Sequence, residues 1–155
     1  MDKISVLFVC LGNICRSPAA EAIFISLLEK KGLTDGFIVD SAGTGSWHIG
    51  KKADSRMRIA AERRDINILS RARQIASKDF DEFNYILAMD DSNFRNIQDL
   101  QNTTASTDFA SIKKIQDFRS VFNAQEVPDP YFGGDEGFNE VLDILEDSVS
   151  GFLES

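Results

Sequence analysis

Short apolar runs alternate with segments of helical spacing along the whole chain. Residues 4–9 form a nearly continuous apolar run, the pattern of a parallel strand buried on both faces. Residues 37–39 and 85–89 predict two more strands, and residues 112–118 predict a fourth. Near the C-terminus the spacing predicts an amphipathic helix with the apolar positions Phe138, Val141, Leu142, Leu145, Val149, Phe152 and Leu153.

Helix signals fill the intervals between the predicted strands. Ser17 is a preferred N-cap residue, Pro18 suits the first helical position, and Gly32 is expected to end that helix. A second helix is predicted from Asp54 to Arg64, with the inner positions Met57, Ile59, Ala60 and Ala61. The remaining elements are a short turn capped by Ser77 and running to Phe83, a helix over residues 92–100, and loops over residues 43–50 and 101–111.

This alternation of strands and helices favours an α/β fold. A parallel sheet covered by helices on both faces, the doubly wound arrangement, is the expected architecture. The length of 155 residues suggests one domain, which we expect to span residues 1–155. Ligands of such sheets bind beyond the carboxyl ends of the strands, often at a helix N-terminus. The turn from Cys10 to Ser17 is expected to lie at that place.

An excess of acidic residues limits the partners of the protein. The chain has 25 Asp and Glu against 17 Lys and Arg, so its net charge of −8 is expected to repel a nucleic-acid backbone. A site for one phosphate remains compatible, because backbone amides and one arginine suffice. No apolar stretch approaches the roughly 18 residues of a membrane span, and the N-terminus lacks a signal peptide's apolar core. We therefore expect a cytoplasmic protein that binds neither nucleic acid nor membrane.

The turn after the first predicted strand carries the candidate chemistry. It begins at Cys10, ends at Arg16-Ser17-Pro18, and contains Gly12 and Asn13, which tolerate the left-handed backbone that curls successive N–H groups toward one point. The thiolate is the nucleophilic form of cysteine, and the helix dipole, the amides and Arg16 would all stabilise it. The guanidinium of Arg16 could grip two phosphoryl oxygens bidentately. Ser17 could hydrogen-bond the Cys10 sulfur as it leaves a phosphoenzyme.

Two other interpretations of this turn compete with a phosphate site. An inert buried cysteine before a helix would leave the accompanying Gly, Asn, Arg, Ser and Pro unexplained. A zinc site would need four ligands, whereas the chain offers two cysteines and, far along the sequence, His48. A cysteine pair in a cytosolic chain of this size is more often catalytic or redox-active than a structural staple.

The turn and four other segments together resemble the low-molecular-weight protein tyrosine phosphatases. The resemblance covers nearly the whole chain in the right order, and its motifs are specific. The matching segments are residues 9–18 (VCLGNICRSP), 40–44 (DSAGT) with Trp47, 71–75 (RARQI), 88–93 (AMDDSN) and 128–131 (PDPY).

The resemblance implies a four-stranded parallel sheet and a two-step reaction without a metal or other cofactor. It implies that Cys10 attacks phosphorus, that Arg16 binds the phosphoryl oxygens, and that Asp129 protonates the leaving phenolate and then activates water. Ser41 and Asn13 would hold the loop's shape. The implied substrate-binding residues are Leu11, Gly12, Asn13, Ile14, Cys15, Ser17, Trp47 and Tyr131. Tyrosine-phosphorylated proteins are the implied partners, and a monomer with at most weak self-association is expected.

Three departures from the family pattern stand out. Ser70 replaces a histidine that supports Asn13 from behind in many members, so the surroundings of the loop are expected to differ. Phe132 replaces a second tyrosine after Tyr131, which keeps an aromatic wall but loses a hydroxyl. Ser55 replaces a common proline, with only a local effect expected.

Several single residues keep two interpretations. Asp129 lies in Pro-Asp-Pro, which holds the chain extended, so it is either a turn residue or the proton donor that the resemblance implies. Cys15 either packs as a small hydrophobe or forms a reversible disulfide with Cys10. Glu21 and Asp40 are surface acids by default, whereas the resemblance places them in a network behind the loop. His48 is interpreted as a solvated loop residue.

Other activities remain as alternatives to a phosphotyrosine phosphatase. An arsenate reductase of the same fold needs further cysteines, and none follows Cys15. A phosphoarginine phosphatase typically has threonine where Ile14 stands, and the bulkier side chain favours tyrosine. A phosphocarrier lacks the pairing of Arg16 with Asp129, and an inactive phosphotyrosine-binding module would not need every reacting residue.

Overall fold

The computed structural model describes residues 2–104, 109–122, 126–131 and 134–155. Its centre is a four-stranded sheet in the order β2-β1-β3-β4, in which every neighbouring pair is parallel. The strands are β1 (Ile4–Cys10), β2 (Phe37–Gly43), β3 (Tyr85–Ala88) and β4 (Ser111–Lys114). The prediction of a single α/β domain with a four-stranded parallel sheet is therefore confirmed.

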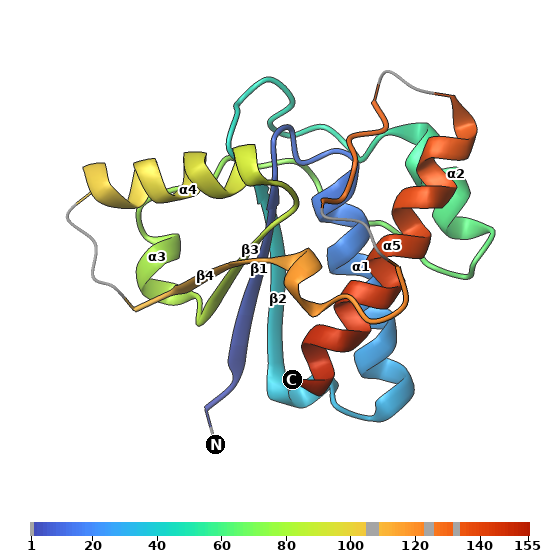
Figure 1. Ribbon diagram of the computed structural model, residues 1–155, viewed down its shortest axis with the longest axis horizontal. Helices are drawn as coiled ribbons and strands as arrows, with labels where there is room; N and C mark the ends of the chain where they lie inside the picture. The colour runs from blue at the N-terminus through green and yellow to red at the C-terminus, as the bar shows by residue number, and fades with distance from the viewer. Residues whose placement is uncertain (1, 105–108, 123–125, 132–133) are drawn as a thin grey trace.

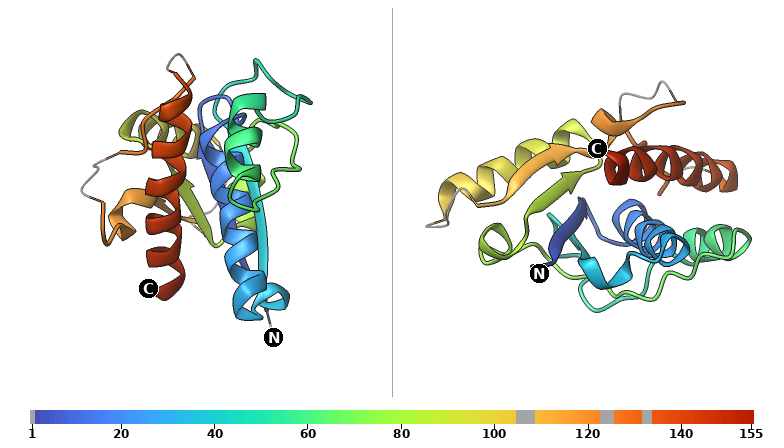
Figure 2. Two further views of the ribbon diagram at one scale, coloured as in Figure 1. Left: turned by 90° about the vertical axis from the view of Figure 1, so that its right-hand side faces the viewer. Right: turned by 90° about the horizontal axis from the view of Figure 1, so that it is seen from below.

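Helices cover both faces of the sheet. On one side lie α1 (Arg16–Lys31) and α5 (Asp135–Glu154), with α2 (Ser55–Glu62) packed against α5. On the other side lie α3 (Asp79–Glu82) and α4 (Asp91–Thr103), as Figures 1 and 2 show. Two 3-10 turns, η1 (Thr34–Gly36) and η2 (Ile115–Phe118), complete the described elements. None of the helices in the described ranges combines the length and apolarity needed to cross a bilayer.

The central strand explains the continuous apolar run at the start of the sequence. Successive side chains of a strand point to opposite faces. Val6 and Phe8 pack in the core under α1 and α5, whereas Leu7 and Val9 pack in the core under α3 and α4. All four are fully buried, and burying a large apolar side chain contributes about 1.5–3 kcal/mol. The strand that leads to Cys10 is thus anchored on both sides.

The first helix begins earlier than its sequence signals predict. Its N-cap is Cys15, without a capping side chain, and Arg16 is its first residue, so Ser17 is not the cap and Pro18 is the third helical residue. Proline is still accommodated there, because the N–H groups of the first turn have no partner within the helix. The predicted end is confirmed: Gly32 is left-handed (φ 68°) and its N–H bonds to the carbonyl of Glu29.

Other boundaries differ from prediction for local reasons. Residues 112–118 divide into the end of β4 and the turn η2, and α4 extends to Thr103 into the expected loop. Lys78, not Ser77, precedes α3. Ile59 is 50% exposed on α2, because only Met57, Ala60 and Ala61 face inward. Asp54 caps α2 by accepting a hydrogen bond from Arg56 N–H. The helix therefore begins at Ser55 although this residue replaces the family's common proline.

The predicted amphipathic helix near the C-terminus is confirmed as α5. Its predicted inner positions are buried, except for Leu153, which is partly buried.

The loops that follow β1, β2 and β3 lie together at the carboxyl ends of these strands (Figure 1). This edge of the sheet holds the residues of the candidate site.

Candidate active site

Cys10 is the last residue of β1, and the loop to α1 curls around its sulfur. Cys10 is 3% exposed. Asn13 adopts the left-handed backbone conformation (φ 58°), and its N–H donates to Cys10 Sγ at 3.3 Å. The conformation predicted from the Gly12-Asn13 pair therefore occurs at Asn13, where it turns an amide toward the sulfur.

Ser17 lies directly beside the sulfur. Its Oγ is 3.0 Å from Cys10 Sγ and accepts a hydrogen bond from Asn13 Nδ2 at 2.8 Å. The Ser17 hydroxyl can donate either to the sulfur or to the Ala42 carbonyl, which lies 3.4 Å away. Ser17 is completely buried, so water does not compete for this contact.

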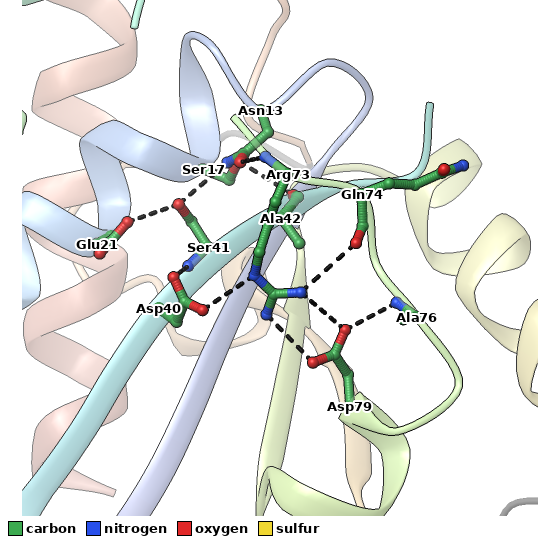
Figure 3. A network of polar contacts seen from close by, with 10 residues as sticks. All are labelled: Asn13, Ser17, Glu21, Asp40, Ser41, Ala42, Arg73, Gln74, Ala76 and Asp79. Carbon is green, nitrogen blue, oxygen red and sulfur yellow. Dashed lines mark hydrogen bonds and ion pairs between the residues drawn. The ribbon is translucent and has the colours of Figure 1, made fainter. Parts of the chain in front are cut away.

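The side chain of Asn13 ties the loop to β2 and to the segment after α2 (Figure 3). Its Nδ2 also donates to Ser41 Oγ at 3.0 Å, and its Oδ1 accepts from the backbone N–H of Arg73 at 3.0 Å. Ser41 Oγ in turn donates to Glu21 Oε1 at 2.5 Å. The strained left-handed turn at Asn13 is thereby fixed from behind by three segments of the chain.

Glu21 and Asp40 both belong to this network, as the family resemblance implies. Arg73 donates to Asp40 through Nε at 3.0 Å and to the buried Asp79 through both terminal nitrogens. Ser70, which replaces the family's histidine, hydrogen-bonds Glu21. Burial raises the pKa of Glu21, and the hydrogen bond from Ser41 acts against that rise. In this chain the support of Asn13 comes from the Arg73 backbone and Ser41.

Gly43 allows the loop to lie directly on the end of β2. A Cβ at Gly43 would stand 2.7 Å from the carbonyl oxygen of Leu11 and 3.1 Å from the N–H nitrogen of Asn13. The next two amides bind the loop: Thr44 N–H donates to the Cys10 carbonyl and Gly45 N–H to the Leu11 carbonyl, each at 2.9 Å. A larger residue at 43 would therefore displace the loop.

Arg16 is buried with its guanidinium held in place. Nη1 donates to Asp90 Oδ2 at 2.6 Å and to the Val127 carbonyl at 3.0 Å, while Nη2 lies 3.7 Å from Asp129 Oδ2. Burial acts to lower the pKa of Arg16, but the nearby Cys10 and Asp90 outweigh it and the pKa is raised. The guanidinium thus stays charged beside the sulfur.

The loop that carries Asp129 is fastened on both sides. Val127 N–H donates to the Met89 carbonyl at 2.9 Å, which places the loop at the end of β3. Arg56 donates to the Tyr131 carbonyl at 2.9 Å from the α2 side. Asp129 itself is exposed, and its Oδ1 accepts from Tyr131 N–H at 3.1 Å. Phe132, the predicted aromatic neighbour, lies outside the described residues.

Cys15 is a buried free thiol in the same loop. Burial raises its pKa, and the carboxylate of Asp54 raises it further. Burial acts to raise the pKa of Asp54, but its bidentate ion pair with the Arg56 side chain and its capping bond from Arg56 N–H outweigh burial and lower it. Cys15 is therefore protonated at neutral pH, unlike a cysteine poised as a nucleophile.

A pocket of about 200 Å³ opens above the loop. Trp47 forms part of its wall and is 67% exposed. His48, interpreted from the sequence as solvated, is half-buried and lines the pocket with its ring 6.2 Å from that of Tyr131. The pocket is lined by Cys10, Leu11, Gly12, Ile14, Cys15, Arg16, Trp47, His48, Asp129 and Tyr131.

Most of the predicted site residues therefore meet at one place. Asn13, Ser17 and Ser41 do not line the pocket but lie beneath the loop, where they hold it. Sequence reasoning missed Asp90 and the Val127 carbonyl, which orient Arg16. The position of Asp90, directly after β3, was the available signal, since parallel strands end at one edge. Within the described ranges, no cluster of three or more His, Cys, Asp or Glu residues is placed to hold a metal ion.

The fold and loop define a doubly wound α/β protein in which a cysteine at the end of the first strand lines a pocket together with an arginine. Residues 5–155 match the family model described as low molecular weight phosphotyrosine protein phosphatase. A relative of that name from Schizosaccharomyces pombe is 42% identical over 99% of this chain and 97% of its own length. The chain belongs to the low molecular weight phosphotyrosine protein phosphatase family.

Solved structures agree with this family assignment. A protein tyrosine phosphatase from Entamoeba histolytica, with Hepes in its active site, superimposes with a TM-score of 0.90 and 44% identity. The match covers 98% of this chain and 96% of that one. An arginine phosphatase from Drosophila superimposes with a TM-score of 0.89 and 35% identity, covering 96% of this chain and 95% of that one.

Proposed function

We propose that the protein hydrolyses phosphotyrosine in proteins through a phosphorylated intermediate on Cys10. The observation that carries this proposal is the surroundings of the Cys10 sulfur. The Asn13 amide and the Ser17 hydroxyl contact it, and the Arg16 guanidinium and the Asp129 carboxylate line the pocket above it. A candidate nucleophilic sulfur, a cation that can bind phosphate and a carboxyl group that can exchange a proton thus lie together.

In the first step the Cys10 sulfur attacks phosphorus and the bond from phosphorus to the tyrosine oxygen breaks. The bonding pair moves to the phenolic oxygen, which takes a proton from Asp129, and tyrosine leaves. Because Arg16 Nη1 is bonded to Asp90 and Val127, Nε and Nη2 are the donors directed to the phosphoryl group. Such positioning and charge stabilisation supply most of the catalysis in phosphoryl transfer.

In the second step water attacks phosphorus and gives its proton to the Asp129 carboxylate. The bond from sulfur to phosphorus breaks, inorganic phosphate leaves, and the pair returns to Cys10 as thiolate. The Ser17 hydroxyl, 3.0 Å away, hydrogen-bonds the sulfur as its charge returns. The same two side chains, Cys10 and Asp129, therefore complete the cycle without a metal or other cofactor.

The walls of the pocket favour an aryl phosphate. Trp47, Tyr131 and His48 line the entrance and present ring surfaces to a phenyl group. Ile14 stands at the position where phosphoarginine phosphatases typically have threonine. The likeness to the Drosophila arginine phosphatase makes phosphoarginine the second substrate to be tested. The cysteine relay of an arsenate reductase would need a third cysteine, and the sequence holds two.

Tyrosine-phosphorylated proteins are the proposed partners, and the cytoplasm is the proposed compartment. Cys10 and Cys15 are both free thiols, and a thiol nucleophile needs a reducing environment to remain active. We propose that the protein acts as a monomer with at most weak self-association, since one chain supplies every residue of the proposed mechanism.

Four substrates assayed side by side test the proposed function. Phosphotyrosine, phosphoserine and phosphoarginine are offered for hydrolysis, and arsenate is offered with a thiol reductant, to the parent and to the Cys10→Ser variant. We expect the parent to hydrolyse phosphotyrosine with the highest kcat/KM and the variant to hydrolyse none, because a serine hydroxyl is a far poorer nucleophile at neutral pH. A preference for phosphoarginine, or near-normal turnover by the variant, would reject the proposal.

A further inference from the structure

A second hollow adjoins the candidate active site. It has a volume of about 530 Å³ and lies between the loop after β2 and helix α4. Leu11 and Trp47 line both this hollow and the active-site pocket, so they form a partition between the two. In Figure 1 the loop after β2 rises above the sheet beside α4. A molecule seated over Cys10 can therefore extend across the partition.

One face of α4 gives the hollow its charge. Asn96, Asp99, Leu100 and Thr103 follow one another at helical spacing and all line it. Asp99 is exposed, and it is the one charged side chain among the residues that line the hollow in the described part of the chain. Leu11, Trp47 and Ile75 supply apolar surface opposite that carboxylate.

The partition is held in shape by its own backbone. The indole of Trp47 lies over Gly45, where a Cβ would stand only 1.8 Å from the ring atom Cζ3. Gly45 N–H donates to the Leu11 carbonyl, which ties the two sides of the partition together. Below them, Gln74 Nε2 donates to the Thr44 carbonyl at 3.1 Å. These contacts fix the partition between the pocket and the hollow.

We propose that this hollow binds the peptide segment next to the phosphotyrosine and that Asp99 selects segments with Lys or Arg. The proposal rests on the proposed function. The 200 Å³ pocket suits one aryl phosphate, so the rest of a protein substrate leaves over the rim, part of which is Leu11 and Trp47. An extended chain advances about 3.3 Å per residue, which places the first few flanking residues in the hollow. The carboxylate of Asp99 attracts a cationic side chain of the peptide, and the apolar surface of the hollow covers the aliphatic stem of that side chain.

Paired phosphotyrosine peptides test this proposal. Each pair differs only in Arg or Glu at one position, scanned over three residues on either side of the phosphotyrosine. We expect the parent to prefer Arg on one side, and Asp99→Asn to reduce that preference in kcat/KM by about two- to fivefold, the scale of an exposed ion pair. Asp99→Lys is expected to reverse it in favour of Glu.

The controls separate this proposal from the proposed function. Asp35→Asn removes the same charge from an exposed turn in η1, away from the hollow, and is expected to keep the parent's preference. All three variants are expected to hydrolyse p-nitrophenyl phosphate at the parent rate. An unchanged peptide preference in Asp99→Asn, with that rate intact, would overturn the selection of cationic segments and leave the phosphatase assignment standing. A parent that hydrolyses neither kind of substrate would overturn both.

Discussion

The hydroxyl oxygen of Ser17 lies 3.0 Å from the sulfur of Cys10, within the first turn of the helix that Ser17 was expected to cap. The serine is turned inward: its oxygen accepts from Asn13 Nδ2, and its hydroxyl lies within hydrogen-bonding distance of both the Cys10 sulfur and, at 3.4 Å, the Ala42 carbonyl. This contact connects the start of α1 with the reacting atom. Ser17 is therefore not a helix cap, and we propose that it stabilises the sulfur as it leaves the phosphoenzyme.

We expect Ser17→Ala to lower kcat for p-nitrophenyl phosphate by roughly ten- to a hundredfold, the scale of one hydrogen bond to a charged group. KM is expected to change little, because the hydroxyl lies beneath the loop and does not line the pocket. Steady-state kinetics measure both. Ser26→Ala, a change on the same helix away from the sulfur, serves as the control. Equal kcat values for Ser17→Ala and the parent would remove this role.

Asp129 is exposed, lines the pocket and lies 3.7 Å from Arg16, and we propose that it protonates the leaving group there. We expect Asp129→Ala to lower kcat by about a hundredfold or more, the usual scale of general acid catalysis. The loss should be larger for phenyl phosphate than for p-nitrophenyl phosphate, because phenolate, with a pKa near 10, is the poorer leaving group. Asp135→Ala, an exposed acid in the first turn of α5, is the control. An unchanged rate with phenyl phosphate would assign the proton donor elsewhere.

Cys15 tests the redox interpretation of the cysteine pair. Peroxide oxidises Cys10 to a sulfenic acid. The Cys15 sulfur can then attack the Cys10 sulfur, which forms a disulfide and releases the sulfenic hydroxyl as water. Since burial raises the pKa of Cys15, its thiolate is scarce and this closure should be slow at neutral pH and faster at higher pH. We expect peroxide-treated Cys15→Ala to regain less activity with added thiol than the parent does. Equal recovery of both proteins would favour the packing role.

Glu21 gives the fold a predictable pH dependence. Because burial raises its pKa above the ordinary 4.5, the folded state holds that proton more tightly than the unfolded state does. The contribution of Glu21 to the free energy of unfolding is therefore complete below about pH 4.5 and is lost as pH rises through the folded pKa. Urea unfolding of Glu21→Gln and the parent from pH 4 to pH 8 measures it. We expect the stability of the variant relative to the parent to increase with pH, and a constant difference would contradict this origin.

The sequence was sufficient for the fold because its strongest patterns coincide with buried elements. The run at residues 4–9 fills both cores from β1, and the apolar spacing near the C-terminus lies on the inner face of α5. Weaker patterns failed where tertiary contacts decide. Ser17 follows the cap pattern but is bound by Asn13 and Cys10, and Ile59 follows the helix period but remains 50% exposed.

The candidate site was predictable only as far as it lies on contiguous motifs. The loop from Cys10 to Ser17 carries its own signal, and the structure places it as expected. His48 and the Val127 carbonyl have no local signature, because each acts through a partner distant in sequence, whereas the place of Asp90 after the third strand was a signal. The support of Asn13 by the Arg73 backbone is likewise invisible, since any residue supplies an N–H.

The central claim is that the Cys10 sulfur receives the phosphoryl group. Rapid acid quenching of the enzyme with a phosphotyrosine peptide, followed by mass spectrometry of the digested protein, tests it most directly. We expect one phosphoryl group on the peptide that contains Cys10, formed during the first turnover and absent from Cys10→Ser. A phosphoryl group on another residue, or a burst of tyrosine release without a modified Cys10, would contradict the account.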